Sequence, residues 1–212
     1  MVTEKGLKKD PELAEKIDRA VFPGLQGGPH DNQTAAIAVA LGEALKPEFR
    51  EYGKQIIKNS KALAKSLMDN GIKLVTNGTD NHMMLIDLTP FGNGKGVFVQ
   101  EALEEANITV NKNTIPAEPS SPFYPSGIRL GTPAITTRGM KEKEMQIIGK
   151  WIAEVIREAR DFKLPNSKEE KARYIKEAKE KIKNNKKIKE IKINVMGLCK
   201  QFPLYPGFDI LR

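Results

Sequence analysis

The chain has 212 residues, of which 39% are hydrophobic and 29% charged, and its formal net charge is +8. This length is enough to bury a core and favours one large domain, or one domain with extensions, over two full-size domains. The longest apolar run, residues 35–41, is too short to cross a membrane.

The first third of the chain predicts two helices. Apolar residues at helical spacing indicate a short helix over residues 11–20 that ends before Phe22. A second, strongly apolar helix is expected over residues 33–45, with Asp31 or Asn32 as its N-cap.

A glycine- and proline-rich loop, residues 23–30, separates these two helices. Its Gly27-Gly28 pair lies just before a helix N-terminus, where exposed backbone N–H groups can bind a phosphate. An ordinary tight turn explains the same pattern, and the loop is neither a P-loop nor a dinucleotide fingerprint.

The middle of the chain predicts helices and strands in alternation. A long amphipathic helix should end at Asn70-Gly71, and strands over residues 72–76 and 82–88 should pair through an Asn77-Gly78 turn. His82, at the start of the second strand, is either an acid–base or stacking residue or a hydrogen-bonded structural one.

The remaining elements complete a mixed pattern. Predicted in order are a helix over 97–107, a strand over 108–113 and a strand around residue 129. A long amphipathic helix follows, with its apolar stripe from Met145 to Ala159 and its start near Thr137 or Gly139. The order indicates an α/β or α+β fold with a small, largely antiparallel sheet.

The C-terminal part is strongly basic. Residues 163–192 contain 12 Lys and Arg against 5 Glu, so this stretch carries +7 of the total of +8. Ser167 and Glu170 form a capping-box pattern for a helix over 168–183, whose thin apolar stripe predicts that it rests lightly on the body. A last short helix is expected over 194–201.

The basic stretch has two explanations. It is typical of a solvated helix face, and it offers only Tyr174 for base stacking, so nucleic acid is not the expected partner. The alternative is a non-catalytic module that binds RNA or an acidic surface through residues 163–192.

Arg129 is the most informative single residue. It lies between Ile128 and Leu130, with Gly127 and Gly131 outside them, which is typical of a short strand whose arginine points into an enclosed place. A guanidinium there needs an anionic partner, either a small-molecule carboxylate or phosphate held bidentately or an internal salt bridge.

Several kinds of site are excluded or unsupported. With two histidines and the single Cys199, a His/Cys metal site is not expected, and no nucleophile elbow is present. The first six residues lack the order of a secretory signal and Cys199 has no internal partner, so we expect a cytoplasmic protein.

Taken together, four segments identify a family resemblance: residues 22–29 (FPGLQGGP), 78–82 (GTDNH), 108–113 (ITVNKN) and 126–139 (SGIRLGTPAITTRG). In this order they resemble serine hydroxymethyltransferase, a pyridoxal-phosphate enzyme of fold type I that moves a one-carbon unit between serine and tetrahydrofolate. The similarity runs from about Val2 to about Pro206.

The resemblance implies a role for each matching position. Arg129 would bind the carboxylate of serine or glycine, and Gly27 and Gly28 would reach the cofactor phosphate of the neighbouring subunit. Asn113 and Phe123 would contact the folate. A homodimer or higher oligomer is therefore implied, with no metal and no membrane.

The resemblance also implies that the chain corresponds to the C-terminal half of the family. Residues 1–45 would end the large cofactor domain, residues 46–165 would form the small domain with its antiparallel sheet covered by helices, and residues 166–212 would be a basic helical extension. The cofactor-linking lysine would lie upstream, so no catalytic residue is expected here and the isolated chain is expected to be inactive. A gene fragment and one half of a split enzyme both stay open.

Overall fold

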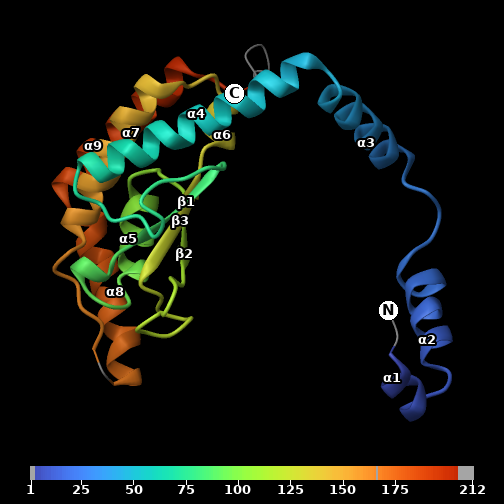
Figure 1. The fold of residues 1–212 in the computed structure, drawn as a ribbon. Coiled ribbons are helices and arrows are strands. Elements are labelled where there is room, and N and C mark those ends of the chain that lie inside the picture. The colour runs from blue at the N-terminus through green and yellow to red at the C-terminus, as the bar shows by residue number, and fades with distance from the viewer. Residues whose placement is uncertain (1–2, 166, 205–212) are drawn as a thin grey trace. The chain divides into compact units, whose positions relative to one another are not determined.

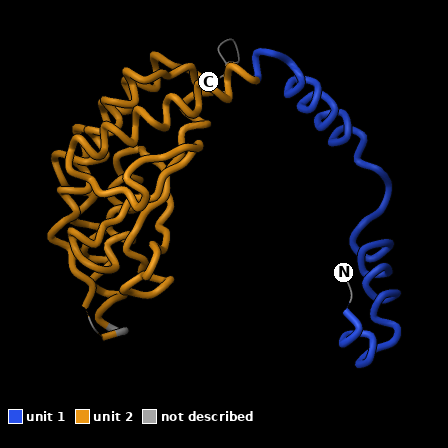
Figure 2. The backbone as a smooth tube through the Cα atoms, viewed as in Figure 1, with its two compact units in different colours: residues 1–49 blue, residues 50–212 orange. Residues whose placement is uncertain are grey.

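The computed structural model describes residues 3–165 and 167–204, so Asn166 and residues 205–212 of the predicted extension lie outside the described residues. The chain divides into two compact units, residues 1–49 and 50–212 (Figure 2). The first unit contains α1 (Glu4–Lys9), α2 (Leu13–Arg19), the irregular turn η1 (Ala20–Leu25) and α3 (Asp31–Ala44).

The first unit has no buried side chain among its described residues. Its exposed large apolar side chains are Leu7, Ile17, Val21, Phe22, Leu25, Ile37, Val39, Leu41 and Leu45. The predicted N-cap was wrong, because α3 begins at Asp31 and its N-cap is His30. The helix therefore starts within a few residues of the glycine pair.

The second unit is built around a three-stranded antiparallel sheet in the order β1-β3-β2 (Figure 1). The strands are β1 (Met83–Asp87), β2 (Asn111–Asn113) and β3 (Gly127–Gly131). Around them lie α4 (Pro47–Asp69), η2 (Thr89–Phe91), α5 (Gly96–Glu105), α6 (Pro133–Thr137), α7 (Glu142–Glu158), α8 (Lys168–Asn184) and α9 (Lys186–Gln201).

Side-chain alternation along the strands gives the sheet one core face and one open face. Met84, Ile86, Ile128 and Leu130 are buried in the core together with apolar residues of α4, α5, α7 and α9. Arg129, on the other face of β3, is exposed. The predicted α/β fold with a small antiparallel sheet is confirmed.

The predicted strand over residues 72–76 is only a single bridge, between Leu74 and Ile86. The expected pairing is present, since Val75 N donates to Leu85 O at 2.9 Å and Asp87 N donates to Lys73 O at 2.9 Å. Asn77 and Gly78 turn with φ of 51° and 148°, as an Asn-Gly pair permits.

The basic C-terminal helices pack more closely than their sequence suggested. Ala178 and Ile182 of α8 are each 2% exposed, so the prediction of a lightly resting helix was wrong. The last helix is also longer than predicted, because Asn185 caps it by accepting a hydrogen bond from Ile188 N at 3.1 Å. Ile188, Ile191 and Val195, spaced for one helix face, are all buried.

Part of the positive charge of these helices is used inside the fold. Lys179 pairs with Glu101 at 2.7 Å, Lys192 with Glu105 at 2.9 Å, and Lys187 with Glu154 at 3.4 Å. These pairs join α8 and α9 to α5 and α7. Each is partly exposed and so stabilises the fold by about 0–1 kcal/mol.

A buried amide joins α4 to the segment between α6 and α7. Asn59 is 0% exposed, and its Nδ2 donates to Thr136 Oγ1 at 2.8 Å and to Met140 O at 2.9 Å. Its Oδ1 accepts from Gln55 Nε2 at 2.9 Å. We expect Asn59→Ala to lower the free energy of unfolding in urea by about 1–3 kcal/mol, because Met140 O would be left buried and unpaired.

Asn194→Ala is the matched control for this prediction. Asn194 is exposed on α9 and its side chain makes no hydrogen bond within the part of the chain that the structure describes. An equal loss of stability in both variants would contradict the role assigned to the Asn59 network.

Candidate functional site

Arg129 lies in an open cleft at the exposed face of the sheet. The cleft has a volume of about 430 Å³ and is lined by the ends of β1, β2 and β3 and by the segment that enters β2: His82, Met83, Thr109, Val110, Asn111, Arg129, Leu130 and Gly131. Polar side chains from β2 (Asn111), from β3 (Arg129) and from the residue just before β1 (His82) therefore line one cleft.

Among the described residues, the guanidinium of Arg129 has one hydrogen-bond partner. Its Nε donates to Asn111 Oδ1 at 3.3 Å, across the β2–β3 pairing in which the two residues are directly opposite. The Nδ2 atom of Asn111 donates to Lys112 O at 3.2 Å, which fixes the amide so that its oxygen faces the arginine. The two terminal nitrogens of Arg129 have no partner within residues 3–165 and 167–204, so no described group competes with an anion for them.

Two expectations for Arg129 are now decided for the described residues. Among them Arg129 forms no ion pair with Asp or Glu, so the internal salt bridge is not seen. The expectation of an enclosed place was wrong for this chain, because Arg129 is exposed. The physical reason is that it lies on the face of the sheet opposite the core.

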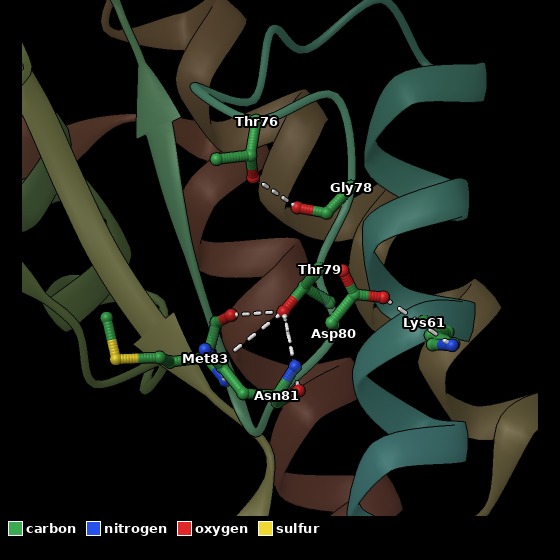
Figure 3. A network of polar contacts seen from close by, with 7 residues as sticks. All are labelled: Lys61, Thr76, Gly78, Thr79, Asp80, Asn81 and Met83. Atoms are coloured by element: carbon green, nitrogen blue, oxygen red, sulfur yellow. Dashed lines mark hydrogen bonds and ion pairs between the residues drawn. The ribbon is translucent and has the colours of Figure 1, made fainter.

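A turn built from side-chain hydrogen bonds leads into the cleft (Figure 3). Thr79 Oγ1 donates to Met83 O at 2.6 Å, and Asn81 Oδ1 accepts from Met83 N at 2.9 Å. Lys61 on α4 lies 3.8 Å from the Asp80 carboxylate. These contacts fix residues 79–83, and so fix the backbone that carries His82.

The side chain of His82 is exposed and makes no hydrogen bond to any described residue. Its backbone carbonyl accepts from Thr132 N at 3.0 Å, which holds the start of β1 against the end of β3. His82 is therefore anchored by its backbone, while its ring is free on the wall of the Arg129 cleft.

Asn113 and Phe123 lie at or near the two ends of the β2–β3 loop, residues 114–126. Asn113 is the last residue of β2, and its Nδ2 donates to Thr114 O at 2.8 Å. Phe123 is 77% exposed, and its carbonyl accepts from Lys112 Nζ at 3.1 Å. The structure thus links the phenylalanine to the residue next to Asn113.

Gly27 and Gly28 lie in the first unit, between η1 and α3. Neither has a positive φ, and a Cβ added at either would meet nothing within 4 Å. Their backbone N–H groups donate to no acceptor among the described residues. No contact within the first unit requires glycine at these two positions. Their backbone N–H groups are therefore available to bind a ligand.

Sequence reasoning missed Asn111 as a site residue. Asn111 and Asn113 lie on the face of β2 opposite to Lys112, and this alternation could have indicated Asn111 as a site residue. Its contact with Arg129, however, depends on the β2–β3 register, which cannot be predicted from the sequence alone. No group of three or more His, Cys, Asp or Glu within the described ranges could hold a metal ion. No described helix is long and apolar enough to span a membrane.

Comparison with known proteins gives one consistent result. Residues 1–152 match the family model described as serine hydroxymethyltransferase. A protein of that name from Phenylobacterium zucineum is 48% identical over 199 residues, which cover 94% of this chain and 42% of the relative. One from Methanospirillum hungatei JF-1 is 47% identical over 197 residues, covering 93% and 42%.

A further relative with the same name, from Endomicrobium trichonymphae, is 45% identical over 203 residues, covering 96% of this chain and 43% of the relative. The chain thus spans less than half the length of the curated relatives it matches.

Proposed function

The chain belongs to the serine hydroxymethyltransferase family of fold-type I pyridoxal-phosphate enzymes, and from that premise we propose that it supplies the substrate-carboxylate, folate and trans-phosphate contacts of such an enzyme. The reaction would interconvert serine and glycine and pass a one-carbon unit to tetrahydrofolate. The observation that carries the proposal is the unpaired guanidinium fork of Arg129 in an open cleft.

Arg129 would bind the carboxylate of serine or glycine. Its fork geometry suits a carboxylate bidentately, and Asn111 already occupies Nε, so only the two terminal nitrogens are offered. This arrangement would hold the amino acid in one orientation. His82, on the same cleft wall, adds a second polar side chain beside Arg129.

Gly27 and Gly28 would bind the phosphate of the cofactor held by a neighbouring subunit, in a homodimer or larger assembly. Their free N–H groups fit an anion, and the lack of any clash inside the unit fits a requirement for glycine that comes from outside it. Pyridoxal phosphate, when bound, supplies the electron withdrawal that makes bonds at the amino-acid α-carbon breakable.

Asn113 and Phe123 would contact the folate. The exposed ring of Phe123 offers an apolar face for a planar heterocycle, and Asn113 offers both a donor and an acceptor. This chain would carry no metal and no catalytic lysine, so a segment outside these 212 residues would hold the cofactor. We expect the protein to work in the cytoplasm.

We propose residues 1–45 as the end of the large cofactor domain, 46–165 as the small domain and 166–212 as its basic extension. RNA or an acidic surface is the alternative partner for residues 163–192. Three lysines of that stretch form ion pairs with glutamates of α5 and α7. These pairs favour a role of the lysines in holding α8 and α9 to the fold over a role in binding a partner.

The proposal can be tested in a hybrid enzyme, in which the N-terminal part of the Phenylobacterium zucineum relative that lies outside the match is joined to this chain. Purified hybrid enzyme should form glycine from serine when tetrahydrofolate and the cofactor are added. A folded hybrid that binds neither serine nor cofactor would refute the proposal.

Replacing Gly28 by valine in the hybrid enzyme should weaken cofactor retention much more than it lowers the thermal unfolding temperature. The added side chain meets nothing within its own unit but would obstruct close approach of a phosphate to the backbone. Gly197→Val is the control, because a Cβ there also meets nothing within 4 Å. Equal cofactor dissociation constants in the wild type and Gly28→Val would leave only the tight-turn explanation.

A further inference from the structure

One carboxylate holds most of the β2–β3 loop together. Glu118 Oε2 accepts from Ile115 N at 3.2 Å and from Ser126 N at 2.9 Å. Glu118 Oε1 accepts from Ser120 N at 3.0 Å and from the Ser126 hydroxyl at 2.6 Å. The start, middle and end of the loop thus converge on a single side chain.

The β2–β3 loop is also held to the rest of the second unit near both of its ends. Ser126 is buried, and its hydroxyl oxygen also accepts from Gly94 N at 2.9 Å, next to the N-terminus of α5. Lys112 of β2 donates to Phe123 O at 3.1 Å. Tyr124, beside Phe123, has the ammonium of Lys171 at 5.4 Å from its ring centre.

The loop nevertheless presents its tip to solvent. Phe123 is 77% exposed and does not belong to the apolar core formed by the described residues. Without internal contacts, a loop with an exposed tip would sample many conformations, because ordering the backbone of each residue costs about 1–2 kcal/mol. The hydrogen bonds to Glu118 offset part of that cost before any ligand arrives.

We infer that Glu118 is a positioning residue for the folate: its carboxylate fixes the β2–β3 loop so that Phe123 and Asn113 are ready to bind, without touching the folate itself. The inference rests on the proposed function, which gives Phe123 and Asn113 their ligand. According to this inference, Glu118 controls the affinity for folate and has no effect on the affinity for serine. The reason is that Arg129 is held by Asn111 and not by the β2–β3 loop.

The ionisation of Glu118 is consistent with this role. Burial raises the pKa of the Glu118 carboxyl, but the hydrogen bonds from Ser126, Ile115 and Ser120 outweigh burial and leave the pKa below its usual range. The group is therefore an acceptor-only carboxylate at neutral pH, which is what four converging donors require.

The first test is a double-mutant cycle for tetrahydrofolate binding in the hybrid enzyme. Glu118→Ala should raise the dissociation constant for tetrahydrofolate about tenfold while that for serine changes less than twofold. In a Phe123→Ala background the same change should have a smaller effect, because the contact it positions is already lost. Glu104→Ala, an exposed glutamate of α5 with no side-chain partner among the described residues, should change neither.

A second readout does not depend on activity. Amide hydrogen exchange at Ile115, Ser120 and Ser126, measured on the full chain, should be faster in Glu118→Ala than in the wild type and in Glu104→Ala. Glu118→Asp, with a carboxylate one methylene shorter, should restore part of the protection.

The outcomes separate two failures. If Phe123→Ala leaves folate binding unchanged, the folate contact proposed for this loop is wrong. If Phe123→Ala weakens folate binding but Glu118→Ala does not, or if the two effects add fully, the positioning role of Glu118 is wrong while the proposed function stands. An equal loss of serine and folate affinity in Glu118→Ala would also overturn it.

Discussion

Replacing Arg129 by alanine in the hybrid enzyme should weaken the binding of serine and glycine by about 1.5–3 kcal/mol, the range for hydrogen bonds to a charged group. This corresponds to roughly 10- to 160-fold in the dissociation constant. The fork of Arg129 has no acidic partner among the described residues, so alanine removes a ligand contact without breaking an internal ion pair. Titration of glycine into each variant measures the effect.

Two variants make this result specific. Arg129→Lys should recover little affinity, because an ammonium cannot reproduce a bidentate fork or the bond from Nε to Asn111. Arg173→Ala is the matched control, since Arg173 is an exposed arginine of α8 that pairs only with Glu177, at 3.3 Å. Unchanged serine affinity in both Arg129 variants would refute the assignment.

The largest loss of stability is expected from Phe98→Ala. Phe98, on α5, is 2% exposed, and its ring lies 5.6 Å from that of Phe162 and 6.0 Å from that of Tyr174. Truncating a buried phenylalanine costs about 3–5 kcal/mol, from lost burial and the cavity left behind. Urea unfolding of the chain should show this loss, and α8 should lose its anchor at Tyr174.

Phe123→Ala is the same substitution at an exposed ring, so it separates packing from binding. It should leave the free energy of unfolding nearly unchanged, because Phe123 contacts no core residue. It should weaken tetrahydrofolate binding in the hybrid enzyme. Equal free energies of unfolding for Phe98→Ala and Phe123→Ala would contradict the packing role assigned to Phe98.

The sequence was most informative where a local rule decides the structure. Asn77-Gly78 turns with positive φ, and Ser167 caps α8 by accepting from Glu170 N at 3.3 Å, both as the residue types predict. The amphipathic stripes of α4 and α7 gave helices within a few residues of those observed. These features depend on neighbours three or four positions away.

The sequence was less informative where distant segments meet. Asn111 and Arg129 are 18 positions apart and meet only because β2 and β3 pair in one register. The four donors of Glu118 span the whole β2–β3 loop, which no spacing rule describes. The burial of α8 depends on Phe98 and Tyr174, which are far apart in sequence, so its thin apolar stripe understated its packing.

The central claim is a proposal: the chain supplies the contacts to substrate and folate, and a segment outside it supplies the lysine that holds the cofactor. The claim has a direct consequence for a polypeptide of these 212 residues alone. We expect none of its lysines to hold the cofactor, because most of them lie on exposed helix faces.

The most direct measurement is the tetrahydrofolate-dependent formation of glycine from serine, with pyridoxal phosphate present, by the 212-residue polypeptide and by the hybrid enzyme at equal concentration. We expect the hybrid to turn over serine and the 212-residue polypeptide to show no turnover above the cofactor alone. Turnover by the 212-residue polypeptide at a rate like that of a whole relative would contradict the claim, because the cofactor-holding lysine would then lie within it.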